Sequence, residues 1–261
     1  ENLLMMRSGL VDYTADFWLD WTFYWYPWAA YSESAALAYI RGTNPKWLPG
    51  TQYEYNNSNY VVLGAVLEAL DVTHGTSRTV KDILTDDIIT PLGLTETSWP
   101  SNSSLPTPAA SGNVFNPEFF GASGALVSTI GDLQKWGTEL RDGTLLTPES
   151  QTLRLNVWRS IVDQQIDGGP EVFGFGLGTI SYGQWIGHVG SVPGFCATTF
   201  AHEQSGTVIS GMENAQTTNI SVYSRIFHRI AAYLFPQSMQ LPDYPTNEPL
   251  KSGHGAEWEG T

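Results

Sequence analysis

Positive charge is scarce in this chain of 261 residues. It has 12 lysine and arginine residues against 26 aspartate and glutamate residues, so its net charge is −14. Binding to nucleic acid needs a basic face that neutralises phosphates, and attraction to an anionic membrane surface needs clusters of Lys and Arg. The charge balance argues against both kinds of partner, so we expect no nucleic acid and no membrane to be bound.

Cysteine is almost absent, because Cys196 is the only one and no internal disulfide can form. It lies in an apolar strand-like run and is interpreted as a buried structural thiol. The five histidines are scattered, without the spacing of a metal site, and no Gly-x-Ser-x-Gly motif occurs. No apolar run approaches the roughly 20 residues that span a bilayer. The sequence therefore predicts neither a metal ion nor another cofactor.

The composition is otherwise that of a folded protein, since 41% of the residues are hydrophobic. The length allows one large domain or two small ones. Helical patterns dominate the first part of the chain, with a helix end closed by Gly9 and another start at Thr147. Further helices are predicted for residues 34–40, 58–70, 76–90 and 128–141.

From about residue 171 the apolar period changes from that of helices to that of strands. Antiparallel strands are predicted at residues 172–180, 184–188, 195–202 and 207–212, followed by an amphipathic helix over residues 217–234. We therefore predict an α+β fold in three parts: a mainly helical region (1–165), an antiparallel sheet with a C-terminal helix (166–235) and an irregular tail (236–261).

The stretch Tyr-Glu-Tyr-Asn-Asn-Ser at residues 53–58 lies between a Pro-Gly turn and an apolar helical run. It places Tyr55 and Asn57 in a loop that a rigid helix supports, where catalytic side chains are often found. A Tyr hydroxyl can accept a proton only when a nearby cation lowers its pKa from about 10. An Asn amide can orient a partner because it both donates and accepts hydrogen bonds. Alone, Tyr-x-Asn is a weak signal, and an ordinary turn is the alternative.

Three more motifs accompany this loop. They are Leu-Leu-Met-Met-Arg-Ser-Gly-Leu at residues 3–10, Ser-Gly-Ala-Leu-Val-Ser-Thr-Ile-Gly-Asp-Leu at 123–133, and His-Val-Gly-Ser-Val-Pro-Gly-Phe at 188–195. In this order the four motifs resemble the serine β-lactamase-like superfamily, which includes class C β-lactamases, D-aminopeptidases, D,D-peptidases, family VIII esterases and acyltransferases. The resemblance covers about residues 2–235. It implies a β-lactamase/transpeptidase-like fold, with a helical region and an antiparallel sheet flanked by a C-terminal helix.

The resemblance also implies roles for individual residues. Tyr55 would be the general base and acid, and Asn57 would orient a lysine or the substrate amide. The motif that begins at His188 replaces Lys-Thr-Gly of the family, and His188 could donate a hydrogen bond to substrate or to Tyr55. Gly190 would let the substrate backbone approach closely, and the N–H of Ser191 would form half of an oxyanion hole.

One family motif is missing, the Ser-x-x-Lys that supplies the nucleophile. The residues three positions before the four lysines are Thr43, Arg78, Asp132 and Glu248. We expect the nucleophile to come from a segment outside this sequence, in a second chain after cleavage or in a longer chain of which this is part. The alternative is a natural remnant of the fold without catalysis.

Aromatic residues are concentrated between residues 11 and 31, among them Trp18, Trp21, Trp25 and Trp28. These rings could form the wall of a pocket for an apolar acyl group, or they could pack against the missing segment or a partner. The sequence thus predicts a secreted or extracellular serine hydrolase that acts on a small ester or amide through an acyl-enzyme. An acyltransferase of the same family and a non-catalytic binding protein are the alternatives.

Overall fold

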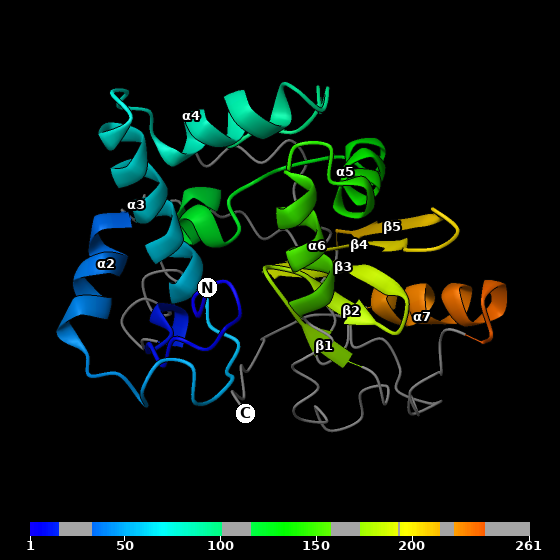
Figure 1. Ribbon diagram of the computed structural model, residues 1–261, viewed down its shortest axis with the longest axis horizontal. Helices are drawn as coiled ribbons and strands as arrows, with labels where there is room; N and C mark the ends of the chain where they lie inside the picture. Colours follow the sequence, from blue (N-terminus) through cyan, green and yellow to red (C-terminus); the bar gives the residue numbers. More distant parts are fainter. Residues whose placement is uncertain (16–32, 101–115, 158–172, 193, 215–221, 238–261) are drawn as a thin grey trace. The chain divides into compact units, whose positions relative to one another are not determined.

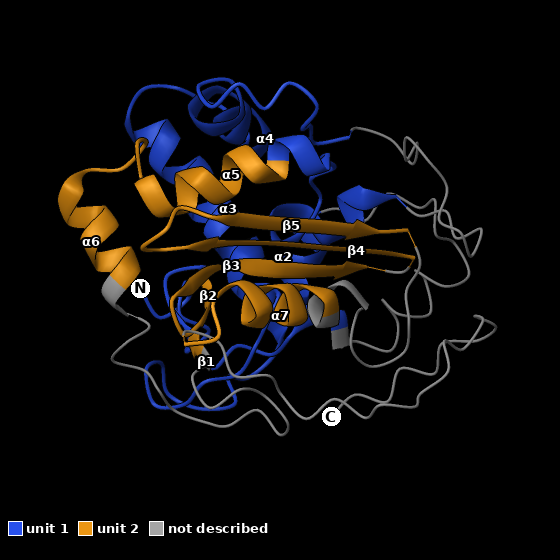
Figure 2. Ribbon diagram, turned by 90° about the vertical axis from the view of Figure 1, so that its right-hand side faces the viewer, with its two compact units in different colours: residues 1–106, 114–132, 175–178 blue, residues 107–113, 133–174, 179–261 orange. Residues whose placement is uncertain are grey.

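The computed structural model describes residues 1–15, 33–100, 116–157, 173–192, 194–214 and 222–237 (Figure 1). The chain divides into two compact units, which are shown in different colours in Figure 2. Unit 1 comprises residues 1–106, 114–132 and 175–178, and unit 2 comprises residues 107–113, 133–174 and 179–261. No helix in the described ranges combines the length and the apolar character that crossing a membrane requires.

Unit 1 is built from helices and turns. Its helical elements are η1 (Tyr13–Ala15), α2 (Glu33–Gly42), α3 (Ser58–Thr73), α4 (Val80–Leu84), the π-helical turn η2 (Thr85–Ile89) and η3 (Pro117–Ser123). Tyr13 lies at the centre of a cluster with Ala36, Ile40 and Val61, so η1, α2 and α3 share one apolar core. The helices predicted at residues 34–40 and 58–70 are thus confirmed, each slightly longer than expected.

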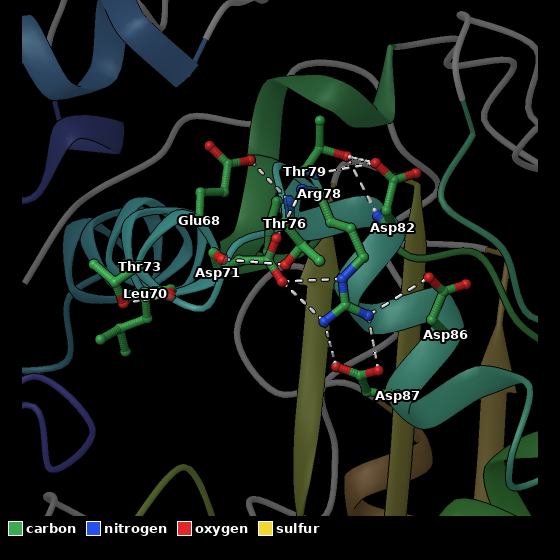
Figure 3. Close-up of polar contacts among 11 residues, drawn as sticks. Glu68, Leu70, Asp71, Thr73, Thr76, Arg78, Thr79, Asp82, Asp86 and Asp87 are labelled. Atoms are coloured by element: carbon green, nitrogen blue, oxygen red, sulfur yellow. Dashed lines mark hydrogen bonds and ion pairs between the residues drawn. The ribbon is translucent and has the colours of Figure 1, made fainter.

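An ion-pair network around Arg78 connects α3 to the start of α4 (Figure 3). The Arg78 guanidinium pairs with Asp71, which is buried near the end of α3, and with Asp87 in η2, both at 2.9 Å. Thr79 and Asp82 form a capping box that starts α4. The prediction of one helix over residues 76–90 is therefore wrong at its start, because residues 76–79 form the loop that carries this network.

The N-terminal residues also differ from the prediction. Residues 2–6 form turns rather than a helix end, and Met6 has a positive φ of 56°. Gly9 adopts φ +78° against Trp47, where a Cβ atom would lie 2.3 Å from the Trp47 carbonyl oxygen. Arg7 donates two hydrogen bonds to the carbonyl of Gly50, so this segment is shaped by contacts with residues 47–50.

An antiparallel sheet whose strands follow one another in chain order belongs to unit 2, except for Phe175 at the end of its first strand. They are β1 (Phe173–Phe175), β2 (Ile180–Tyr182), β3 (Trp185–Val192), β4 (Phe195–His202) and β5 (Val208–Glu213). The predicted strand at 172–180 is divided, because a turn separates β1 from β2. The strand predicted at 184–188 is longer and includes the whole His-Val-Gly-Ser-Val motif.

Helices cover both faces of this sheet. The remaining helices are α5 (Ile130–Asp142), α6 (Pro148–Val157) and α7 (Val222–Leu234). On one face, Ile186 and Ala201 pack with Leu140 of α5. On the other face, Phe200 stacks on Phe227 of α7, with ring centroids 4.4 Å apart. α6 and most of α5 belong to the same unit as the sheet, and the regions predicted at 1–165 and 166–235 stay a prediction.

From the packing of α7 against the sheet we predict that the protein is less stable in acid. His228 of α7 is 4% exposed, its ring meets Tyr182 edge-on at 4.7 Å, and burial lowers its pKa to about 4. In the unfolded chain a His has a pKa of about 6.5, so the unfolded state binds more protons between these two values. The free energy of unfolding should therefore fall by about 1–3 kcal/mol as the pH drops from 6.5 to 4.

Urea unfolding at pH 7.5, 6.0, 5.0 and 4.2 measures this effect, with His228→Phe as the test variant. Phe keeps a ring against Tyr182 but cannot take up a proton. We expect the variant to lose part of the decline in stability below pH 6.5. An identical decline in the variant and in the original protein would show that other groups cause the acid sensitivity.

Candidate active site

The loop before α3 is held in place by hydrogen bonds to residues far from it in sequence. Asn56 donates from Nδ2 to the Leu10 carbonyl at 2.5 Å and accepts the Ser58 N–H at 2.8 Å. The Ser58 hydroxyl donates to the Val11 carbonyl and accepts the Tyr13 N–H, at 2.8 and 2.9 Å. Asn56 and Ser58 are almost completely buried, so these bonds fix the backbone on either side of Asn57.

The Asn57 side chain is oriented by Asp12 and Thr14. Its Nδ2 donates to Asp12 Oδ2 at 3.3 Å and to Thr14 Oγ1 at 3.2 Å. The backbone N–H of Asn57 donates to the same Asp12 oxygen at 3.2 Å. Because a carboxylate only accepts, the amide atom facing Asp12 must be nitrogen. Asn57 Oδ1 receives no hydrogen bond from the described part of the chain, so it can accept one from another group.

Tyr55 lies two residues before Asn57 in the same loop. Its ring meets Phe175 edge-on, with centroids 6.2 Å apart. Although 47% of the residue is exposed, loss of water around the hydroxyl raises its pKa, and the negative charge of Asp12 raises it further. Burial and the Asp12 charge thus both favour the protonated form of the Tyr55 hydroxyl.

The glycine-rich stretch from residue 173 supports this loop. Phe175 also packs against Tyr53, at 5.8 Å between ring centroids. The Gly178 N–H donates to the Leu4 carbonyl, and a Cβ atom at Gly178 would lie 3.0 Å from the Tyr60 hydroxyl. Residues 175–178 thus lie against Tyr53, Tyr55 and Tyr60 of unit 1.

In unit 2, His188 is a neutral histidine. Its Nδ1 lies 2.5 Å from the Val189 carbonyl oxygen, which can only accept, so Nδ1 carries the proton. Burial lowers the pKa of His188, and the bond to Val189 offsets this only in part. In this tautomer Nε2 is an acceptor, and donation from it to a substrate requires protonation or a change of tautomer. His188 therefore supplies no fixed positive charge.

The register of β3 and β4 shows where the Ser191 N–H points. Just beyond the strand ends the Glu203 N–H donates to the Gln184 carbonyl, so this pair is hydrogen-bonded. Hydrogen-bonded and non-hydrogen-bonded pairs alternate along antiparallel strands. Ser191, which pairs with Cys196, lies an odd number of positions beyond Gln184 along β3. Ser191 and Cys196 therefore form a non-hydrogen-bonded pair. Its N–H therefore points away from β4, on the side where β2 pairs only with residues 185–187.

The side chains around Ser191 agree with this register. Ser191 Oγ and Cys196 Sγ lie 3.4 Å apart, as expected for the closer of the two pair types. Cys196 is 5% exposed, which confirms the predicted buried thiol. No atom of the described residues lies within 4 Å of the position that a Cβ on Gly190 would occupy.

The predicted site residues thus fall into separate groups. Tyr55 and Asn57 lie in unit 1, and His188, Gly190 and Ser191 lie in unit 2. That these groups form one site stays a prediction. Trp18, Trp21, Trp25 and Trp28 lie outside the described residues. Among the described residues no three His, Cys, Asp or Glu side chains gather as metal ligands do.

The residues missed by the sequence reasoning are Asp12 and Thr14. The Asp12 carboxylate accepts the Thr14 N–H and hydroxyl, a local turn that an Asp-x-Thr sequence favours. That turn could have been predicted. Its contact with Asn57 could not, because nothing in the spacing connects two residues so far apart.

Comparison with known proteins agrees with this fold. Residues 1–233 match the Beta-lactamase family. A D-stereospecific amidohydrolase from Streptomyces sp. is 25% identical, with a TM-score of 0.70 over 82% of this chain and 67% of that one. The D-amino acid amidase from Ochrobactrum anthropi SV3, complexed with D-phenylalanine, is 20% identical, with a TM-score of 0.66 over 89% and 76%.

A third similar structure is the octameric penicillin-binding protein homologue from Pyrococcus abyssi. It is 20% identical, with a TM-score of 0.69 over 91% of this chain and 56% of that one. These similarities confirm the predicted β-lactamase/transpeptidase-like α+β fold, with its antiparallel sheet and C-terminal helix. With the family match covering most of its length, the chain belongs to the beta-lactamase family.

Proposed function

We propose that this chain is the larger part of a serine hydrolase that cleaves an ester or amide through an acyl-enzyme. The observation that carries the proposal is the oriented amide of Asn57, two residues after Tyr55, on a loop that is hydrogen-bonded to residues 10–14. A loop under so many specific constraints suits catalysis, which needs side chains held close to one geometry.

The nucleophile would be the serine of a Ser-x-x-Lys segment outside this sequence. Its lysine ammonium would offset the charge of Asp12 and lower the pKa of Tyr55. Tyr55 would take the serine proton as the serine oxygen bonds to the acyl carbon, then pass that proton to the departing alcohol or amine. Water would release the acid and regenerate the serine. Asn57 Oδ1 is available to accept from the lysine or from a substrate amide.

The edge of β3 offers a backbone group that could stabilise the tetrahedral intermediate of this reaction. The Ser191 N–H points away from β4 and is suited to bind the oxygen of a tetrahedral intermediate. The N–H of the nucleophilic serine would complete the oxyanion hole. His188 is neutral, so it offers little attraction to a substrate carboxylate. This favours uncharged esters and amides over β-lactams as substrates.

The relatives suggest which amide to test first. A D-stereospecific amidohydrolase and a D-amino acid amidase are both similar to this chain. D-Phenylalanine amide, with its L enantiomer for comparison, is therefore the first amide substrate to test. p-Nitrophenyl acetate serves as an ester that needs little recognition.

We further propose that the Ser-x-x-Lys segment joins unit 2 at the edge of β5. The His202 N–H donates to the Thr207 carbonyl, so by alternation the backbone groups of Val208, Ser210 and Met212 point away from β4. No strand of the described ranges pairs with that edge. An open edge of this kind is a template for an added strand.

A non-catalytic binding protein is the second candidate. It is favoured by the absence of Ser-x-x-Lys and by the raised pKa of Tyr55 in this chain. A binding protein would keep the fixed loop and the open strand edge but would not form an acyl-enzyme.

Mass spectrometry of protein purified from its natural source separates these two candidates. After labelling with a fluorophosphonate, which reacts with activated serines, we expect the native particle to contain a Ser-x-x-Lys segment whose serine alone carries the label. The segment would be a second polypeptide or part of a longer chain. A native particle with the mass of this chain alone, 28.7 kDa, and no label would instead support the binding protein.

A further inference from the structure

Asp12 acts on both residues of unit 1 to which the proposal gives catalytic roles. Its Oδ2 accepts the backbone N–H and the Nδ2 of Asn57, at 3.2 and 3.3 Å. It is also the charged group that, after burial, contributes most to raising the pKa of Tyr55. One carboxylate therefore orients the amide and sets the electrostatic surroundings of the phenol.

Asp12 is itself held in a defined position. Its Oδ1 accepts the Thr14 N–H at 3.0 Å and the Thr14 hydroxyl at 2.9 Å. The flanking residues Val11 and Tyr13 are both bonded to the Ser58 hydroxyl. With bonds to both oxygens and a clamped backbone, the carboxylate cannot turn away from Asn57 without breaking several contacts.

No ion pair of Asp12 is found among the described residues. All four of its described hydrogen bonds come from neutral amides or a hydroxyl. Among the described residues, Tyr60 of α3 interacts electrostatically with Tyr55 and Tyr53, and Glu54, next to Tyr55 in sequence, is paired with Lys46. The tyrosines are uncharged at neutral pH, and the Glu54 charge is balanced by its lysine.

We propose that Asp12 is a positioning residue whose carboxylate fixes the Asn57 amide and places a negative charge near the Tyr55 hydroxyl. The first part rests on the proposed function, because Asn57 needs a fixed orientation only if it serves the reaction. The second part concerns this chain alone.

Tyrosine labelled with ¹³C at Cζ gives a direct test by NMR titration of this chain. The Tyr55 signal is the one that Tyr55→Phe removes. We expect its midpoint to lie above that of a free tyrosine and to move down in Asp12→Asn, which removes the charge. Thr14→Val is the matched control, since it removes neutral contacts of the same cluster and should leave the midpoint in place. An unchanged midpoint in Asp12→Asn, or an equal shift in Thr14→Val, would overturn the proposal.

The complete protein provides a second readout. With D-phenylalanine amide, or with p-nitrophenyl acetate if the amide is not cleaved, Asp12→Asn should reduce kcat by about 10- to 100-fold and displace the pH dependence of kcat. Asp12→Glu keeps the charge but moves it, so kcat should fall while the Tyr55 midpoint stays high. An Asp12→Glu variant with full kcat would contradict the positioning role, even if Asp12→Asn failed to fold.

These measurements separate the failure of this inference from the failure of the proposed function. If Tyr55→Phe abolishes turnover but Asp12→Asn changes neither the Tyr55 midpoint nor kcat, the hydrolase stands and the role of Asp12 is wrong. If Tyr55→Phe keeps full turnover while Asp12→Asn shifts the midpoint, Asp12 controls Tyr55 but Tyr55 is not the catalytic base.

Discussion

Tyr55→Phe should reduce kcat of the complete protein by a factor of about 100 to 10,000. The substitution removes one oxygen, and with it the group that would carry the proton from the nucleophile to the leaving group. Without that transfer the serine hydroxyl must attack unaided, which is slow at neutral pH. The free energy of unfolding should change by about 0.5 kcal/mol or less, because Tyr55 is 47% exposed and Phe retains the ring contact with Phe175.

Tyr53→Phe is the matched control for this experiment. Tyr53 belongs to the same loop and packs against the same Phe175 ring, but its hydroxyl has no part in the proposed proton transfer. We expect it to retain kcat within about threefold, because surface hydroxyls away from the chemistry contribute little. Release of ammonia from D-phenylalanine amide measures both variants, and p-nitrophenyl acetate replaces it if the amide is not cleaved. Equal losses in both would show that the loop, rather than the Tyr55 hydroxyl, is needed.

The α+β architecture was predictable because its signals are local. Residues 195–202 form a short, mostly apolar run with aromatic and β-branched residues, and β4 occupies them as predicted. The apolar run after residue 57 is long enough to identify α3 without knowledge of its partners. Both patterns depend on neighbours within a few residues, which a sequence displays directly.

Elements shaped by distant residues were not predictable in the same way. The start of α4 is delayed to Val80 because Asp71 accepts the Arg78 N–H and Glu68 accepts the Val80 N–H, both from α3. These carboxylates take backbone donors that would otherwise extend the helix toward residue 76. Residues 2–6 likewise form turns. They precede Arg7 and Gly9, which contact Gly50 and Trp47 far along the chain.

The candidate site shows the same limit. Tyr55 and Asn57 could be found because they are two residues apart in a recognisable motif. Asp12 could not, because its bonds to Asn57 join residues that only the folded loop brings together. The direction of the Ser191 N–H also needed the strand register, since shifting the pairing by one residue would reverse it.

Gly187→Ala should lower the free energy of unfolding of unit 2 by about 3 kcal/mol. The added Cβ would clash with the backbone of the strand paired to β3, which carries the His188 motif. A Cβ atom at Gly187 would lie 1.9 Å from the Thr199 carbonyl oxygen and 2.7 Å from Phe200 Cα. Gly187 faces Phe200 in the closer type of antiparallel pair, so β3 and β4 would have to separate. Backbone atoms cannot rotate aside as a flexible side chain can, so hydrogen bonds along the ladder would be lost.

Gly190→Ala is the control on the same strand, because no atom of the described residues lies within 4 Å of its added Cβ. It should change the free energy of unfolding by about 1 kcal/mol or less, within the range of a change that meets no neighbour. Urea unfolding followed by tryptophan fluorescence compares the two variants, since Trp185 of β3 is fully buried. Equal stability of both variants would mean that β3 and β4 can separate near Gly187 at little cost. In that case the ladder would not be what fixes His188 and Ser191, and their positions would have to depend on the contacts of β3 with other elements.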